Sequence, residues 1–373
     1  MKNNIYLNNQ FSPAANKKIY VLQGLRGILL LEIFMFHSFQ TRLFNGAFAV
    51  SAFFMLSGFV LVYKHLNDDT AAQNPYHFAR KKILSIYPYH VLFLLLAFIP
   101  CITRMIAANE FSGIFSQFSQ LAVSLLLVQS WIPDTSYYFS MNGISWYLST
   151  SIFLYFCFPF ICSHLKQWHT RRHAYVVMVF LILVDLFISL AAFCFEYYNI
   201  SFLASHWFTY IFPPARLPDF LIGCCLGYLY LNHRDDYTNI PDKALHVLEA
   251  FTIVGIMASI LFYNIASIDP VRYVSLFAIP SLLLIFLALS PKSIFSKFLL
   301  SDILIQLGDM SPYLYISHGV SIEYLNYINK YILSCRLSVI DLRLLSFLCI
   351  IIFARSVFLL KKRKAVRGLR AGS

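Results

Sequence analysis

Apolar stretches of about 20 residues recur along almost the whole chain, and they limit its fold more than any other feature. A helix rises 1.5 Å per residue, so a stretch of this length crosses a hydrocarbon core of roughly 30 Å. Backbone groups in lipid must satisfy their own hydrogen bonds, which favours helices. Ten stretches fit, at about 19–38, 44–63, 86–107, 144–164, 175–195, 210–231, 247–264, 272–290, 305–325 and 340–360. The sequence therefore predicts an all-α polytopic integral membrane protein.

The composition agrees with a membrane location. Hydrophobic residues make up 59% of the 373 positions and charged residues only 12%, which is roughly half the share typical of a soluble protein. The net charge of +12 comes from cations in short loops and tails between apolar stretches. This is the positive-inside pattern and not a stripe for binding nucleic acid. The lipid bilayer is therefore an expected partner, and nucleic acid is not.

Loop charges and the parity of the spans predict the topology. Residues 117–131 are apolar but too short to cross, so we expect a short interfacial or re-entrant segment on the outer side. About ten crossings then place both termini in the cytoplasm. Residues 1–360 form a single transmembrane domain, and residues 361–373 form a basic cytoplasmic tail. No cleavable signal peptide is indicated, because the first apolar segment is long and contains charges.

Several familiar chemistries are not indicated. The eight cysteines form no CxxC pair and no Cys/His metal spacing, so no metal site is predicted. The chain has no Walker loop, no GxGxxG after a strand, no GxSxG and no HExxH. The best candidates are ionisable groups inside apolar spans, which are costly there and usually face the bundle interior or a wet cavity.

The first span carries three such residues. Arg26 and His37 are eleven residues apart, close to three full turns, so they share one helix stripe about 16 Å apart along the axis. Glu32 falls on a different stripe, where a cation on a neighbouring helix could pair with it. Two interpretations stay open: a functional line of a cation and an imidazole, or an arginine that extends to the interface and a histidine that caps the far end.

Small and polar residues in the second and fourth spans are further candidates. Ser57, next to Gly58, is either a small residue that lets two helices approach closely or a substrate contact. Trp146 and Ser149 begin a helix on the outer side, where a tryptophan is also a common interfacial anchor.

Later spans add three more polar candidates. Arg216 and Asp219 are three residues apart and can form an ion pair on one helix face. His318 is a lone intramembrane histidine, for which a helix–helix hydrogen bond is as reasonable as a catalytic role.

Six motifs, in order, resemble the bacterial membrane-bound acyltransferase-3 family, whose members O-acylate sugars. The resemblance covers nearly the whole chain and follows the ten-span layout. In the first motif, Arg26 and His37 match the family signature of an arginine, ten residues and a histidine. The motifs are GLRGILLLEIFMFH, AVSAFFMLSGFVL, FARKKILSIYPYH, NGISWYLSTSIFLYFCFP, ARLPDFLIG and SPYLYISH.

Two positions depart from the family pattern. Many members have an Arg-x-x-Arg pair in the cytoplasmic loop before the third span, and the matching residues here are Lys82 and Ser85. Many have a glutamate after Trp-x-Leu-Ser, and here that position is Ser151. Arg80, Lys81 and Lys82 keep the loop positive, although lysine lacks the bidentate fork of arginine.

The resemblance implies the reaction and its location. It implies a multi-pass enzyme of the bacterial inner membrane that moves an acyl group, usually acetyl, from cytoplasmic acyl-CoA to a sugar hydroxyl. The acceptor would be a cell-surface polysaccharide, an exopolysaccharide or a glycolipid precursor. Acyl-CoA (acetyl-CoA) is then a co-substrate, and no cofactor is bound permanently.

The resemblance also implies roles for the candidate residues. Arg80, Lys81 and Lys82 would meet the CoA phosphates, with Arg26 as a further candidate, and the thioester would arrive near His37. His37 would be the general base, or would carry the acyl group itself in a covalent relay. Candidates to stabilise the oxyanion are Arg216, Trp146 and His318.

Two other classes of function fit the same spans. A glycolipid or small-molecule transporter or flippase also has polar intramembrane residues, although no paired broken helices in two matching halves are visible here. A non-catalytic partner in polysaccharide assembly would be favoured if the changes at Ser85 and Ser151 had removed activity.

Overall fold

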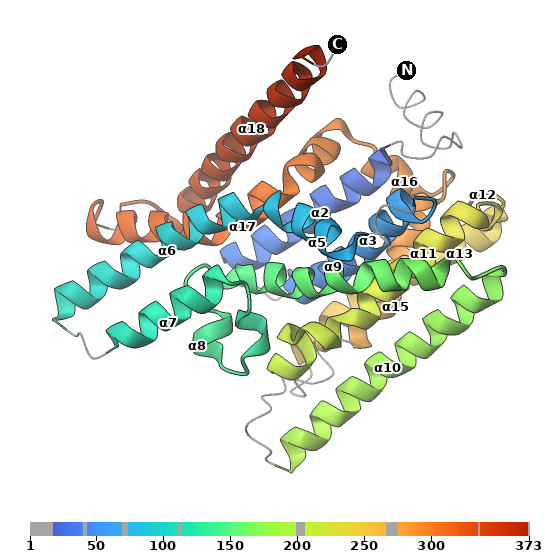
Figure 1. Ribbon diagram of the computed structural model, residues 1–373, viewed down its shortest axis with the longest axis horizontal. Helices are drawn as coiled ribbons and strands as arrows, with labels where there is room; N and C mark the ends of the chain where they lie inside the picture. The colour runs from blue at the N-terminus through green and yellow to red at the C-terminus, as the bar shows by residue number, and fades with distance from the viewer. Residues whose placement is uncertain are drawn as a thin grey trace.

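The computed structural model describes residues 18–39, 43–68, 74–109, 113–198, 206–265, 275–334 and 336–371, and this part of the chain is helical without strands. Figure 1 shows the arrangement of the helices. Their bounds are α2 (Tyr20–Phe39), α3 (Gly46–His65), α5 (Pro75–Leu84), α6 (Tyr87–Ala108), α7 (Ile114–Leu125), α8 (Thr135–Tyr138), α9 (Trp146–Leu165), α10 (Arg171–Tyr197), α11 (Leu217–Asn232), α12 (Asp235–Thr238), α13 (Asp242–Ile265), α15 (Ser275–Leu289), α16 (Ile294–Leu299), α17 (Asp302–Tyr331) and α18 (Val339–Ala371). Short turns η1 (Gln129–Trp131), η2 (Gly143–Ser145), η3 (Trp207–Ile211) and η4 (Pro213–Arg216) connect some of them.

Six of the described helices are long and apolar enough to cross a membrane. They are α2, α3, α9 with its preceding turn, α10, α13 and α18. Helices α5 and α6 add a seventh if they count as one span with a 48° bend. The chain is therefore a multi-pass, all-α membrane protein, and the predicted number of about ten crossings stays a prediction.

The remaining predicted spans differ from a regular apolar helix. α15 has 15 residues, and α17 is 30 residues long but carries many polar groups. The segment expected to begin a span at residue 210 does not do so, because regular helix starts only at Leu217. Pro213 and Pro214 lack the backbone N–H that the interior of an α-helix needs. Residues 207–211 instead form one turn of π-helix, and residues 213–216 form one turn of 3-10 helix. The apolar segment 117–131 forms α7 and η1, both shorter than a membrane span, as expected.

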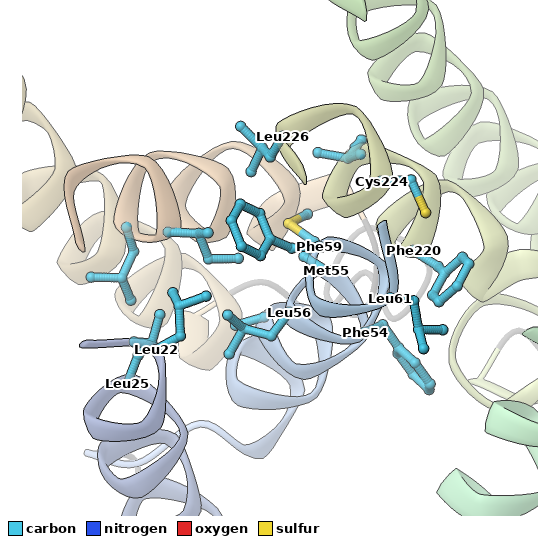
Figure 2. Close-up of a cluster of buried hydrophobic side chains, with 14 of the residues drawn as sticks. Leu22, Leu25, Phe54, Met55, Leu56, Phe59, Leu61, Phe220, Cys224 and Leu226 are labelled. Atoms are coloured by element: carbon cyan, nitrogen blue, oxygen red, sulfur yellow. The ribbon is translucent and has the colours of Figure 1, made fainter. Parts of the chain in front are cut away.

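The core of the bundle is α2 packed against α3 and α17, with α11 on the far side of α3 (Figures 1 and 2). Figure 2 shows Leu22 and Leu25 of α2, Met55 and Phe59 of α3, and Cys224 of α11 within one buried apolar cluster. Large apolar side chains fill this region, as packing in a lipid environment requires.

Glycines allow the core helices to touch through their backbones. A Cβ atom on Gly308 of α17 would overlap the carbonyl oxygen of Gln23 on α2, and one on Gly27 would overlap that of Leu304. Gly58 of α3 and Gly223 of α11 meet the facing backbone in the same way. Small residues therefore set the separation of both helix pairs, which is the common solution between membrane helices.

The peripheral helices expose apolar side chains. α10 and α18 lie on opposite edges of the view in Figure 1. Phe187 of α10, Val254 of α13 and Ile352 of α18 are each about two-thirds exposed. These faces suit contact with lipid tails.

The start of α2 and the second half of α18 lie at the same end of the bundle. Lys18 forms an ion pair with Asp309 of α17, at 2.5 Å. One turn further along α17, the Lys361 ammonium of α18 packs 5.0 Å from the centre of the Tyr313 ring. We refer to this as the Arg26 end, and to the opposite end as the His37 end.

We predict that Gly308→Leu lowers the free energy of unfolding by about 1–3 kcal/mol, because the leucine side chain must push α17 away from α2. Thermal unfolding of the purified protein in detergent measures the effect. The control is Gly255→Leu, since a Cβ atom there comes no closer than 4.0 Å to Pro280. Equal midpoints for the two variants would contradict the proposed backbone contact.

Candidate active site

Three adjoining cavities follow α2 through the described part of the bundle. The first, the Arg26 cavity, has a volume of about 240 Å³. The second, the His37 cavity, has about 190 Å³. The third, the Asn142 cavity, has about 340 Å³ and continues toward the His37 end. Together they follow one another along α2 from the level of Arg26 to that of His37.

Neighbouring cavities share lining residues, so each lies directly against the next. The Arg26 and His37 cavities have Ile33, Val50 and Tyr315 in common. The His37 and Asn142 cavities have His37, Phe139, Ile144 and Trp146 in common. Arg26 lines the first cavity, and His37 lines both the second and the third. The two residues that were predicted to share one stripe of α2 therefore face adjoining cavities.

Hydrogen bonds fix the tautomer of His37. Its Nδ1–H donates to the carbonyl oxygen of Ile33, one turn earlier on α2, at 2.9 Å. Nε2 is therefore the unprotonated nitrogen of the neutral ring. It accepts no hydrogen bond from any described residue, so its lone pair is free to take a proton from a molecule in the cavity.

His318 of α17 lies directly beside His37. Its Nδ1–H donates to the carbonyl oxygen of Tyr315 at 2.7 Å, which leaves Nε2 as an acceptor. This Nε2 lies 3.4 Å from His37 Nδ1, and the ring centres are 5.0 Å apart. The two histidines, predicted from separate motifs, therefore form one pair in which His318 can stabilise a protonated His37.

Trp146 places an indole beside the same imidazole. It is buried and lines both cavities that contain His37. Its ring packs 4.9 Å from that of Tyr210 and 6.4 Å from that of Phe54, which fixes its orientation. The indole N–H donates to none of the described residues, so it is available to an oxygen atom in the cavity.

Tyr315 closes the boundary between the first two cavities. Its hydroxyl donates to the carbonyl oxygen of Ile144 at 3.0 Å, and its ring lies 5.3 Å from that of Tyr147. The sequence analysis missed Tyr315, although it precedes His318 by three residues and must share a helix face with it.

The cationic residues of the third motif separate into two groups. Lys82 lines the Arg26 cavity, as does Ser57 of α3. Arg80 and Lys81 are exposed on α5 and do not line it. The serine at position 151 also lines this cavity and donates to the carbonyl oxygen of Tyr147 at 2.7 Å.

Two predicted residues make structural contacts outside the cavities. Glu32 accepts a hydrogen bond of 2.6 Å from the backbone N–H of Asn45, so it holds the start of α3. Its partner is therefore an amide, and not a cation on a neighbouring helix as anticipated. Ser149 accepts a 3.4 Å hydrogen bond from the N–H of Ser130 and ties η1 to α9.

Arg216 and Asp219 form the predicted ion pair, at 2.5 Å and fully buried. Arg216 also donates to Ser51 of α3 at 2.7 Å and lies 5.6 Å from the centre of the Tyr210 ring. Tyr210 lines the His37 cavity, so Arg216 is separated from that cavity by one ring. The pair supports the cavity wall and does not itself line the cavity.

The sequence analysis also missed His206, which lines the His37 cavity opposite α2. Its Nδ1 lies 3.4 Å from the hydroxyl of Tyr138. Burial, together with the charge of Asp134, raises the pKa of Tyr138 to about 12, so the phenol stays protonated and can donate to this nitrogen. His206 stands next to the irregular turns at 207–216, where helix periodicity gives no information about facing.

We predict that Asp219→Asn lowers the free energy of unfolding by about 3–5 kcal/mol, because it leaves a buried guanidinium without its carboxylate. The matched control is Asp185→Asn. Asp185 is buried within electrostatic reach of both Asp219 and Arg216, but it forms no ion pair with Arg216, and its carboxyl oxygens make no hydrogen bond with the described residues. We expect that control to unfold at or above the wild-type midpoint, and a larger loss there than at position 219 would contradict the assignment.

Curated relatives of this chain are named as acyltransferases. The acyltransferase MdmB of Streptomyces mycarofaciens is 26% identical over 81% of this chain, which spans 79% of that protein. The O-acetyltransferase OatA of Staphylococcus aureus is 23% identical over 82% of this chain, which spans only about half (51%) of its length. No solved structure matches the chain significantly.

The family comparison covers most of the chain. The model of the acyltransferase-3 family, described as an acyltransferase domain, matches residues 19–361. That range contains the three cavities and all of the candidate residues discussed above. The chain therefore belongs to the acyltransferase-3 family and is an acyltransferase.

Proposed function

We propose that this acyltransferase moves an acyl group from cytoplasmic acyl-CoA to a sugar hydroxyl on the opposite side of the membrane. Acetyl is the acyl group that we propose. The acceptor would be a cell-surface or exopolysaccharide sugar, or a glycolipid precursor. The name of the O-acetyltransferase relative supports O-acylation. Assignment as an enzyme also removes the basis for the transporter and non-catalytic interpretations of the spans.

One observation carries the proposal: the Arg26 cavity adjoins the His37 cavity along α2, so a donor in the first cavity lies one shared wall away from the imidazole in the second. The Arg26 cavity is bordered by cations, as a site for a phosphate-bearing donor requires. Its boundary with the His37 cavity is formed by Ile33, Val50 and Tyr315. A donor arm of about 16 Å, the rise between Arg26 and His37, is long enough to pass this boundary from the Arg26 cavity and to bring a thioester to the level of His37 on α2.

The histidine pair supplies the proton chemistry. His37 Nε2 takes the proton of the acceptor hydroxyl as its oxygen attacks the thioester carbonyl carbon. Nδ1–H of the resulting imidazolium faces the lone pair of His318 Nε2. The tetrahedral intermediate then collapses: its C–S bond breaks, and the new C–O bond remains as the ester. The departing thiolate of CoA takes the proton back from His37.

The negative oxygen of the intermediate needs a donor in the same place. The indole N–H of Trp146 is the best candidate, because Trp146 lines both cavities that contain His37 and its N–H donates to none of the described residues. Arg216 is less suited, since its charge is already engaged by Asp219. A covalent acyl-histidine relay uses the same atoms, and label trapped on His37 with donor alone would favour it.

We predict that His37→Ala lowers the transfer rate at least about 100-fold, the loss expected when a general base is removed. Transfer of radiolabel from acetyl-CoA to a glycan extract of the host cells is measured in membranes from cells that express each variant. The protein level of each variant is checked. His164→Ala is the matched control, because His164 is exposed and lies outside the three cavities. Wild-type activity in His37→Ala would contradict the mechanism.

His318→Ala should lower kcat by about 10–100-fold with little change in the KM for acetyl-CoA. The reason is that His318 orients His37 and does not touch the donor. We expect His318→Gln to recover part of this loss, since an amide oxygen can also accept from His37 Nδ1. Ser317→Ala is the control, as this hydroxyl bonds only within α17, to Tyr313 and Leu314. A purely structural role would lower both parameters or the unfolding midpoint, without rescue by glutamine.

A further inference from the structure

A lysine from the last helix contacts the part of the Arg26 cavity that is lined by Lys82 and the exposed Ser85, which we call the mouth of the cavity. Lys361, on α18, donates a hydrogen bond of 3.0 Å to the backbone carbonyl of Ser85. Ser85 ends α5 and lines the Arg26 cavity together with Lys82. An amino group that is 276 residues away in sequence is therefore held beside this mouth.

The surroundings of Lys361 position its charge without neutralising it. The ammonium lies over two aromatic rings, 5.1 Å from the centre of Tyr89 and 5.0 Å from that of Tyr313. These rings hold the stem in place and favour the cation by their negative faces. No carboxylate among the described residues forms an ion pair with Lys361.

Other cations collect at the same mouth. Arg26 and Lys82 line the cavity, and Lys64, at the end of α3, lies within electrostatic reach of both. None of the three forms an ion pair with a carboxylate in the described part of the chain. Like charges brought together in this way repel each other, so the arrangement is stabilised when a polyanion binds between them.

We propose that Lys361 is a ligand for the phosphate groups of acyl-CoA, acting with Lys64, Lys82 and Arg26. The inference rests on the proposed function and adds two residues to the donor site, one of them from α18. Before the donor binds, the Lys361 amino group is held by the Ser85 carbonyl. A phosphate oxygen then replaces that carbonyl as a charge-assisted acceptor, which is the stronger partner.

Two donors separate phosphate binding from a structural role. Acetyl-CoA carries the phosphates, and S-acetylpantetheine has the same thioester without them. Lys361→Met keeps an apolar stem over both tyrosines but removes the charge. We expect it to raise the KM for acetyl-CoA about tenfold, as the loss of one charge-assisted hydrogen bond predicts. Its activity with S-acetylpantetheine should equal that of wild type.

Matched variants sharpen the test. Lys361→Arg should stay within about twofold of wild type, since it keeps the charge. Lys362→Met removes the neighbouring, exposed charge and should leave both donors unaffected. The proposal is overturned if Lys361→Met leaves the KM for acetyl-CoA unchanged, or if it slows both donors equally.

A measurement on the unaltered protein covers the case in which Lys361→Met fails to fold. Lysines are reductively methylated in detergent with and without CoA, and the products are mapped by mass spectrometry. CoA should protect Lys361 and pantetheine should not, whereas equal modification under all conditions overturns the proposal. If CoA protects Lys361 but wild type transfers no acyl group, the proposed function fails and the phosphate site stands.

Discussion

The backbone contact between α2 and α17 is the constraint on which the site depends. Glycines on both helices remove the side chains that would keep them apart, so the helices approach until backbone atoms touch. That approach fixes their register, and the register puts His37 of α2 beside His318 of α17. A wider separation would break the histidine pair and merge the Arg26 and His37 cavities, because Tyr315 of α17 forms part of their shared wall.

A second constraint keeps the two cavities distinct. Tyr315 is tied to the turn before α9 by its hydrogen bond to Ile144 and packs on Tyr147. α9 also carries Trp146, so one helix start positions both the barrier and an N–H donor. Asp219 and Arg216 act behind this layer, where their ion pair and the Tyr210 ring support the wall of the His37 cavity. The buried charges are thus placed to hold an aromatic ring in the wall of the His37 cavity.

Helix periodicity explains which parts of the site could be predicted from the sequence. The eleven-residue spacing of Arg26 and His37 guarantees a shared stripe in any straight helix, and a three-residue spacing allows the ion pair of Arg216 and Asp219. The contact between Lys361 and Ser85 has no such signature, because it depends on how two distant helices pack. If Lys361 binds phosphate as proposed, α18 supplies a cation at the position where the third motif has a serine.

Irregular backbone accounts for most of what the sequence did not reveal. His206 and Tyr210 reach the His37 cavity from a segment in which prolines prevent a regular helix, so neither period nor facing could be assigned. A cation on a neighbouring helix was one partner considered for Glu32, but the backbone N–H of Asn45, just before α3, donates to it instead. Local backbone groups at helix ends and distant side chains compete for hydrogen bonds to the same polar side chain. A sequence pattern does not show which of them forms the bond.

The central claim is that the thioester of a donor bound in the Arg26 cavity reaches His37. Bromoacetyl-CoA tests it directly, since this analogue places an alkylating carbon where the acyl group should be. The alkylated residue displaces bromide and gains a CH2–CO–S-CoA group, and hydrolysis of that thioester leaves a carboxymethyl group. Peptide mapping after brief labelling and hydrolysis should find this group on His37, with labelling suppressed by excess acetyl-CoA, which has no free thiol to consume the reagent. Label confined to residues outside the three cavities, or labelling of His37 that acetyl-CoA does not suppress, would contradict the claim.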